Sequence, residues 1–136
     1  MAVRDLHNNI AAENALDSTA ISSDTTTNGE IIDTRDYESV EFLIKSETLT
    51  DGTYTPSITE GDEDDLSDGS AVVAADLLGT IAAATFAAAD DNAVKKIGYS
   101  GTKRYVRLNI TSASTTSGGT LSAVAVKGHP ALAAVA

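Results

Sequence analysis

The stretch from Tyr105 to Thr111 alternates polar and apolar residues without a break, and no other feature constrains the fold of this chain so strongly. Its apolar members are Val106, Leu108 and Ile110. A period of two residues is typical of a β-strand with one buried face. Upstream, Ser100-Gly101 separates this strand from the β-rich run 94–99. That pair predicts a hairpin, because glycine adopts the positive φ that a tight turn requires.

A second alternating run spans residues 38–45 and predicts another strand with one face in the core. Its apolar face carries Val40, Phe42 and Ile44. The opposite face carries Ser39, Glu41, Leu43 and Lys45, which is typical of a solvated sheet face with one apolar interruption. We expect the apolar faces of the two strands to be buried together between two sheets.

The remaining elements follow from turn signals and shorter β-rich runs. Strands are expected at 18–22, 30–33, 53–60 and 120–127, with turns at Asn28-Gly29 and Asp51-Gly52. Pro56 places its strand at an edge or a bulge, because proline cannot donate a ladder hydrogen bond. Residues 61–69 form a loop. For 71–89 we expect a helical turn ending near Gly79 and then an extended segment through Phe86.

These elements predict an all-β protein, an antiparallel β-sandwich that forms a single domain. The length of 136 residues suits one hydrophobic core. Residues 1–17 are too sparse in apolar side chains to join that core, so we expect an N-terminal arm, a β-sandwich at 18–130 and a C-terminal tail at 131–136. With no cysteine, the chain has neither disulfides nor a thiolate metal site.

The charges are distributed unevenly along the chain. All 20 acidic residues lie at or before Asp91, where three basic residues leave a net charge of −17, while the remainder carries +6. Two explanations remain open: an acidic surface that faces a basic one across a subunit contact, or strands that interleave and neutralise each other within one sandwich. The second is favoured. Nucleic acid binding is disfavoured by the overall charge of −11 and the few aromatic residues.

Catalytic, cofactor and membrane functions find no support in the sequence. Neither His7 nor His129 stands in a context that suggests a Ser-His-Asp relay. The glycines follow neither the phosphate-loop nor the dinucleotide pattern, and no apolar run approaches the length of about 18 residues that spans a bilayer. We therefore expect a protein that is not an enzyme, needs no cofactor and does not enter a membrane.

The acidic loop is the one candidate metal site. Asp62, Asp64, Asp65 and Asp68 supply the oxygen ligands that calcium prefers. The loop departs from the helix-loop-helix calcium pattern, since it lacks glycine at the sixth position and has Val73 at the twelfth. A solvated loop is the favoured interpretation.

The final strand, 120–127, is apolar on both faces, so something other than its own core is expected to cover one of them. Its alternating residues are Leu121, Ala123 and Ala125 on one face, and Val124 and Val126 on the other. We expect self-association through this strand. The candidate contact residues for another subunit or a shell are Leu6, Ile10, Leu121, Ala123 and Ala125.

Several segments in sequence order resemble a family of small structural proteins of tailed bacteriophages and prophages. They are Asp51-Gly52-Thr53-Tyr54-Thr55-Pro56, Asp76-Leu77-Leu78-Gly79-Thr80, Lys95 to Tyr99 with Lys103 to Arg107, and Ala123 to Pro130. The resemblance implies a jelly-roll-like β-sandwich that serves as a capsid decoration or cement protein on the outer surface of the phage head. It further implies the major capsid protein as partner, a homo-oligomer that is a trimer, and synthesis in the cytoplasm of a bacterial host.

Two other functions are compatible with such a sandwich. One is a head-to-tail connector or tail component of the virion. The other is a carbohydrate- or receptor-binding module displayed on the particle. The second is disfavoured because only four tyrosines and no tryptophan are present to stack on a sugar.

Overall fold

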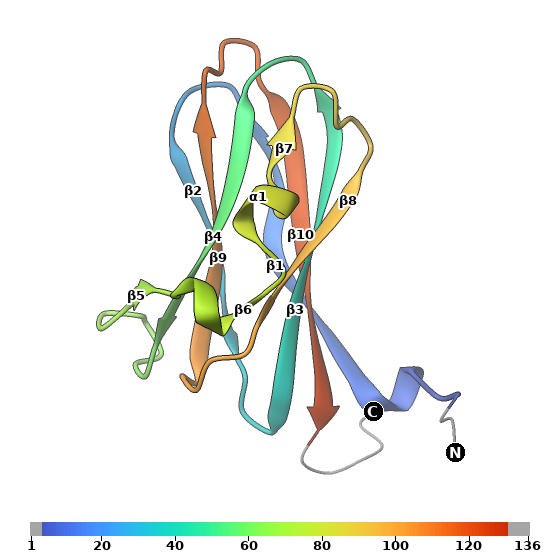
Figure 1. The fold of residues 1–136 in the computed structure, drawn as a ribbon, viewed down its shortest axis with the longest axis vertical. Helices are drawn as coiled ribbons and strands as arrows, with labels where there is room; N and C mark the ends of the chain where they lie inside the picture. The colour runs from blue at the N-terminus through green and yellow to red at the C-terminus, as the bar shows by residue number, and fades with distance from the viewer. Residues whose placement is uncertain (1–3, 131–136) are drawn as a thin grey trace.

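The computed structural model describes residues 4–130 and shows two antiparallel sheets packed face to face (Figure 1). The predicted tail 131–136 lies outside the described residues. Sheet A contains, in spatial order, β1 (Ile10–Ile21), β10 (Gly119–Pro130), β3 (Tyr37–Leu49), β8 (Val94–Tyr99) and β6 (Leu77–Leu78). Sheet B contains β2 (Thr26–Asp33), β9 (Tyr105–Ala113), β4 (Thr53–Gly61) and β5 (Ser70–Ala71), with β7 (Phe86–Ala87) on the other end of β4. The helical turns are η1 (His7–Asn9), η2 (Ala74–Asp76) and α1 (Ile81–Ala84).

The connectivity of the two sheets is that of a jelly roll. Among the strands that form the two layers, β1, β10, β3 and β8 lie side by side in one sheet, and β2, β9, β4 and β5 in the other. The chain crosses between sheets at nearly every connection, so strands that are consecutive in sequence face each other across the core. This arrangement of two Greek keys confirms the predicted all-β, jelly-roll-like sandwich.

The core forms where the two alternating strands face each other. All six residues predicted to be buried together are buried. They are Val40, Phe42 and Ile44 of β3 in sheet A, and Val106, Leu108 and Ile110 of β9 in sheet B. Tyr54 and Phe86 from the far edge of sheet B complete the same cluster. The period-two pattern therefore identified the centre of the molecule correctly.

The predicted hairpin at Ser100-Gly101 is wrong. The strands on either side of it, β8 and β9, lie in different sheets and do not pair. Gly101 does not have a positive φ; its role is steric, because a Cβ there would lie 2.5 Å from the hydroxyl oxygen of Tyr99. A glycine between two strands indicates a turn, but it does not indicate whether the chain returns to the same sheet or crosses to the other.

Of the two other predicted turns, one is correct and one is wrong. The Asp51-Gly52 turn joins β3 to β4, with Gly52 at φ 93°. Asn28-Gly29 instead lies within β2, at a register shift opposite β9. Gly29 is needed there because a Cβ would overlap the carbonyl oxygen of Ala15 on β1. The turn between β1 and β2 falls earlier, at residues 22–25.

The backbone groups of Pro56 point away from β9, toward the free side of β4, in agreement with the edge prediction. The backbone N–H of Val72 donates to the carbonyl oxygen of Ile58 on the side away from β9. Alternate residues of a strand direct their backbone groups to the same side, so the imide of Pro56 also faces that side. The missing N–H of proline therefore costs no hydrogen bond to β9.

The N-terminal arm predicted at residues 1–17 is wrong for residues 10–17. These residues form the first part of β1, which pairs with β10 from Ile10 to Ile21. Ala15 and Leu16 are buried in the core. Register shifts after Asn14 and after Leu16 interrupt the alternation, so the sequence shows no clear period. The described residues that precede β1 are 4–9, and they lie outside the sheet.

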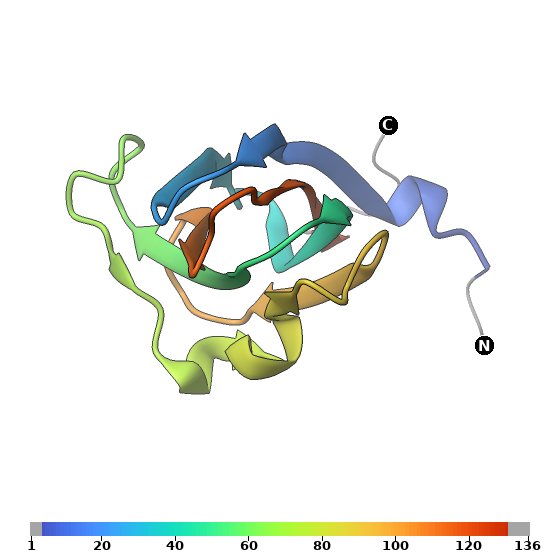
Figure 2. The same ribbon diagram turned by 90° about the horizontal axis from the view of Figure 1, so that it is seen from above.

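The segment between β5 and β8 runs along the outside of one edge of the sandwich and adds β6 to sheet A and β7 to sheet B (Figure 2). The expected helical turn before Gly79 is η2. The extended segment expected next is wrong at residues 81–84, which form α1. Thr80 explains this, because its side-chain oxygen accepts a hydrogen bond from the backbone N–H of Ala83 at 3.1 Å and caps the helix.

The two oppositely charged parts of the sequence neutralise each other within one sandwich. Every ion pair among the described residues joins an acid at or before Asp91 to a base after it. The pairs are Glu13–Lys127, Asp33–Arg104, Asp62–Lys103 and Asp90–Lys95. The two hydrogen bonds from Arg104 hold the pKa of Asp33 at about 2, well below its usual value of 3.8. Four of the six basic residues after Asp91 are thus paired within one sandwich, as the favoured explanation expects.

Candidate interaction surface

The outer faces of the two sheets differ in chemistry. The outer face of sheet B is polar, and its side chains bond to each other. Asn109 donates to the Thr59 hydroxyl at 2.8 Å and accepts from Arg107 at 3.1 Å. Thr26 and Thr111 are hydrogen-bonded at 3.1 Å nearby. Polar side chains that bond to each other in this way are typical of a sheet face that contacts water.

The outer face of sheet A carries an apolar area at its centre. Residues that are partners across neighbouring strands point to the same face, so the register defines rows across the sheet. One row runs Asn14–Val124–Leu43–Lys96 and the next runs Ala12–Val126–Glu41–Gly98–Leu78. Val124 is 42% exposed, and Leu43 and Val126 are half-buried. We call Leu43, Val124 and Val126 the sheet A apolar centre.

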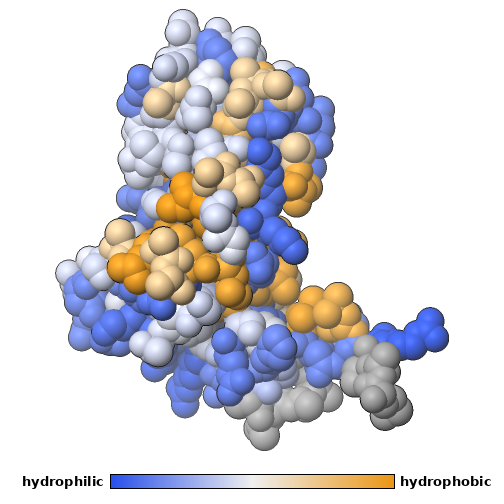
Figure 3. Space-filling model, viewed as in Figure 1, coloured by the Kyte–Doolittle hydropathy of each residue, from blue (hydrophilic) through white to orange (hydrophobic). Residues whose placement is uncertain are grey.

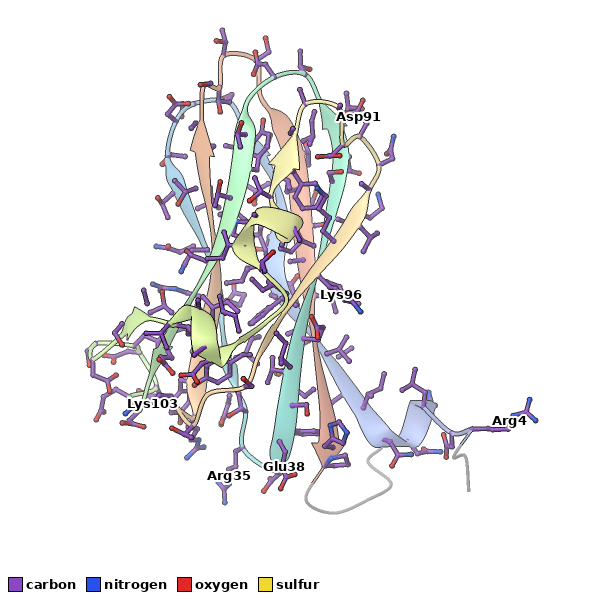
Figure 4. The ribbon with its side chains drawn as sticks, viewed as in Figure 1. Arg4, Arg35, Glu38, Asp91, Lys96 and Lys103 are labelled. Carbon is purple, nitrogen blue, oxygen red and sulfur yellow. The ribbon has the colours of Figure 1, made fainter. Side chains whose placement is uncertain are left out.

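Charged side chains flank the sheet A apolar centre. Glu41 and Lys45 lie on β3 on either side of Leu43, and Lys96 projects outward from β8 (Figure 4). None of these three belongs to an ion pair among the described residues. Glu41 lies over Gly98, where a Cβ would lie 2.8 Å from its carboxylate. The partial burial of Glu41 raises the pKa of its carboxyl group.

A second apolar area, the lateral patch, lies on the segment that crosses the edge of the sandwich. It consists of Val73, Leu78 and Ile81, which are 59%, 52% and 36% exposed. Figure 3 shows apolar residues gathered over η2, β6 and α1. Asp76 is the only ionisable residue at positions 71–84, and exposed alanines fill the space between the larger side chains. Contiguous exposed apolar areas of this kind mark contact sites.

Three of the five predicted contact residues lie in the core. Leu121, Ala123 and Ala125 face inward and are buried, because their partners on β3 include Phe42 and Ile44. The opposite face of β10, with Val124, is the exposed one. The prediction that this strand has an uncovered apolar face stands, but the residues assigned to that face are corrected.

The other two predicted contact residues, Leu6 and Ile10, lie near the N-terminal end of β1. Leu6 is exposed and Ile10 is half-buried. Together with His129 and Pro130 they line a cavity of about 670 Å³ at the end of β10. Nothing among the described residues covers this cavity, so a contact there remains a prediction.

The acidic loop uses its carboxylates to hold its own backbone. Asp68 accepts from the backbone N–H groups of Asp62 and Glu63 at 2.8 and 3.2 Å, and Asp65 accepts from that of Ser67 at 2.9 Å. These hydrogen bonds lower the pKa of Asp65 and Asp68. Within residues 4–130, no group of three or more potential ligands gathers to hold a metal ion. The four candidate ligands, Asp62, Asp64, Asp65 and Asp68, are therefore not brought together.

One contact between a serine and a histidine was not foreseen from the sequence. The hydroxyl of Ser39 and Nδ1 of His129 lie 2.6 Å apart near the surface. Among the described residues, this imidazole donates no hydrogen bond to a carboxylate. A relay of the Ser-His-Asp type needs a carboxylate that orients the histidine in a site shielded from water, and this pair has neither feature.

The lateral patch and the charges beside the sheet A apolar centre were also not predicted as sites. One signal for the patch was present: residues 71–84 contain a single ionisable residue, in a chain with 21% charged residues. Leu43 was recognised as an apolar interruption, but its neighbours on β10 and β8 come from distant parts of the sequence. In the described part of the chain, no helix is long and apolar enough to cross a membrane.

Comparison with known proteins shows similarity of fold alone. No protein-family model and no curated protein matches the sequence. The SPBc2 prophage-derived protein YomS has a similar structure, with a TM-score of 0.51 and 12% identity over 93% of this chain and 98% of that one. The structure of infectious bursal disease virus Gx strain gives a TM-score of 0.47, with 19% identity over 90% of this chain. The VP2 subviral particle of the same virus gives 0.48, with 17% identity over 88%.

The similar structures differ in how much of their own length this chain covers. This chain spans 35% and 33% of the two infectious bursal disease virus chains, and both scores lie below 0.5, so no argument rests on them. YomS, in contrast, is matched over nearly its whole length. The same sandwich fold therefore makes up nearly the whole chain of one prophage-derived protein.

Proposed function

We propose that this chain is a structural protein of a bacteriophage particle, a decoration or cement protein that binds the outside of the assembled head and has no enzymatic activity. The observation that carries the proposal is the lateral patch. Val73, Leu78 and Ile81 expose apolar side chains in a chain with a net charge of −11. A highly charged small protein has little reason to expose such an area unless a partner covers it.

Two further observations support a virion role. The fold is shared with YomS, whose description as a prophage-derived protein suggests a phage origin for this chain as well. The jelly roll is also an architecture that viral capsid proteins use repeatedly. The residues that resemble small structural phage proteins point in the same direction.

The proposed partner is the major capsid protein of an assembled shell. A protein that binds only the assembled shell stabilises it by its binding free energy, and many copies add their contributions. In this proposal the lateral patch lies against the shell, and the polar outer face of sheet B contacts solvent. The chain is made in the cytoplasm of the bacterial host and resides on the surface of the phage head.

The test uses particles of the phage or prophage that encodes the chain. Particles from a gene deletion are mixed with the purified chain, sedimented and imaged by cryo-electron microscopy. We expect stoichiometric copies on the outside of the head, and heads that resist heat better than undecorated ones. Density at the neck or tail would instead favour a connector or tail component, and absence from the particle would overturn the proposal.

A pair of variants assigns the contact to the lateral patch. Ile81→Asp places a charge in the patch, whereas Thr55→Asp places the same charge on the polar outer face of sheet B. We expect only the first to lose particle binding, because an unpaired charge in an apolar contact is costly to desolvate. Equal binding of both variants would remove the patch from the contact. Binding of particle-free chain to an immobilised glycan array would support a carbohydrate-binding module.

A further inference from the structure

The charges on the outer face of sheet A are arranged symmetrically about an apolar row. On β3, Glu41 lies two residues before Leu43 and Lys45 lies two residues after it, all on the outer face. On β10, Val126 and Ser122 lie at the same spacing on either side of Val124, which is the partner of Leu43. Opposite charges therefore stand at equal distances from one apolar row.

Neither Glu41 nor Lys45 has a close charged partner among residues 4–130, although Lys96 on the neighbouring strand partly offsets the effect of burial on the pKa of Glu41. The described residues form four ion pairs elsewhere. The ammonium group of Lys45 has only a long contact of 3.4 Å, to the carbonyl oxygen of Ser46. Glu41 and Lys45 cannot pair with each other, because four residues of strand separate them by about 13 Å. A second molecule could satisfy both.

We propose that two copies of this chain associate through the outer face of sheet A, related by a two-fold axis that runs along the Val124–Leu43 row. A rotation about that axis reverses the strand direction of the second copy. Leu43 and Val124 then meet their own counterparts, and Glu41 of each copy meets Lys45 of the other. Both charged contacts occur twice, as a two-fold contact requires.

The face is shaped for this packing. Gly98 has no side chain, so Glu41 lies flat across β8 and does not stand above the sheet. Lys96 ends the same row, so the axis sets it opposite Lys96 of the second copy, and the two Glu41 carboxylates lie diagonally on either side of this pair. Sheets with twisted strands pack face to face readily, with their strands about 30° apart.

A second copy fits this face better than an unrelated partner does. A shell protein would need its own matching array of charges, whereas a two-fold axis supplies the complement from the chain itself. Glu41 is already partly withdrawn from water, which raises the pKa of its carboxyl group, and Lys45 of the second copy would add to the opposing effect of Lys96. The inference does not depend on the proposed role in a virion.

The test is charge complementation, measured on the full chain by analytical ultracentrifugation. The wild type should sediment as a dimer at high concentration. Glu41→Lys alone and Lys45→Glu alone should each weaken association by about 100-fold or more, because each change places like charges together at two positions. An equimolar mixture of the two variants should form dimers again, since residue 41 of each copy then meets a residue 45 of opposite sign.

Glu30→Lys is the matched control, because it makes the same charge change at an exposed position on β2 in sheet B. It should leave association unchanged. Thermal melting of each variant checks that the subunit remains folded. If a charge variant fails to fold, Val124→Lys replaces it, since this exposed side chain lies on the proposed axis.

Three results would overturn the inference. They are a wild type that remains monomeric at every concentration, a trimer, and a mixture of the two charge variants that fails to associate. Loss of particle binding by Ile81→Asp with an intact dimer would separate the shell contact from this one. Conversely, a monomeric wild type that still binds particles through the lateral patch would reject the dimer and leave the proposed function standing.

Discussion

At the scale of single residues, Asp51 shows how one side chain joins two loops. Its carboxylate accepts three backbone hydrogen bonds from the loop between β9 and β10, from Thr116, Ser117 and Gly118 at 3.0, 3.0 and 2.8 Å. It thereby ties the β3–β4 turn to a segment more than 60 residues away in sequence. These donors lower the pKa of the Asp51 carboxyl group below its usual value of 3.8.

We predict that Asp51→Ala lowers the melting temperature, because three backbone N–H groups lose their acceptor. The melting temperature of Asp51→Asn should lie between those of the wild type and Asp51→Ala, since the amide keeps one acceptor oxygen. A lowered pKa in the folded state means that the carboxylate stabilises the fold above its unfolded pKa and that this contribution is lost as pH falls through the folded pKa. The difference in melting temperature between the wild type and Asp51→Asn should therefore be largest at neutral pH and shrink as the pH is lowered. A difference that does not change with pH would contradict this explanation.

At the scale of elements, the two strands with period two carry the core and the edge strand β1 completes it. β3 and β9 face each other across the sandwich, and their inward-facing apolar residues are fully or almost fully buried. β1 contributes Ala15 and Leu16 to the same cluster. The stability of the fold should therefore respond to both kinds of strand, in different ways.

We predict that Phe42→Ala or Leu108→Ala destabilises the fold by about 2 to 5 kcal/mol, through lost burial and the cavity left behind. Both side chains are completely buried. Chemical denaturation measures the change in the free energy of unfolding. Thr55→Ala on the polar outer face of sheet B is the control and should cost much less. A stability unchanged by either core variant would show that the two strands do not face each other.

Two N-terminal deletions test the place of β1. Removal of residues 1–17 should destabilise or unfold the domain, because it takes away most of a strand paired along β10. Removal of residues 1–9 should leave the melting temperature nearly unchanged, since β1 begins at Ile10. Equal melting temperatures for the two deletions would mean that residues 10–17 form a dispensable arm after all.

At the scale of the whole molecule, the jelly roll is held by pairings between distant segments. β1 pairs with β10, at opposite ends of the sequence, and consecutive strands mostly lie in different sheets. Loops must therefore close before the strands that they connect can pair, and this costs conformational entropy early in folding. The same topology places the acidic and basic parts of the chain against each other.

We predict slow refolding, on a timescale of about milliseconds to seconds, as is usual for sandwiches with non-local pairing. Stopped-flow dilution from denaturant, followed by tyrosine fluorescence, measures the rate. Refolding in microseconds would show that local structure, and not strand pairing between distant segments, limits the rate.

The sequence by itself determined the class of the fold, the core at the centre of β3 and β9, the edge position of Pro56 and the turn at Asp51-Gly52. Each of these depends on local rules: the period of a strand, the missing N–H of proline, or the positive φ of a turn glycine. The same rules excluded a disulfide framework, since the chain contains no cysteine.

Tertiary structure alone decided which of two apolar faces turns inward, and therefore where a partner can bind. On β10 the pattern showed that Ala123 and Val124 point in opposite directions, but only the register with Phe42 and Ile44 places Ala123 inside. Bulges hid β1, and the connection at Gly101 crosses between the sheets and does not form a hairpin. The physical reason is common to all three: local sequence determines the conformation of a strand, whereas its neighbours are chosen by pairing and burial summed over distant segments.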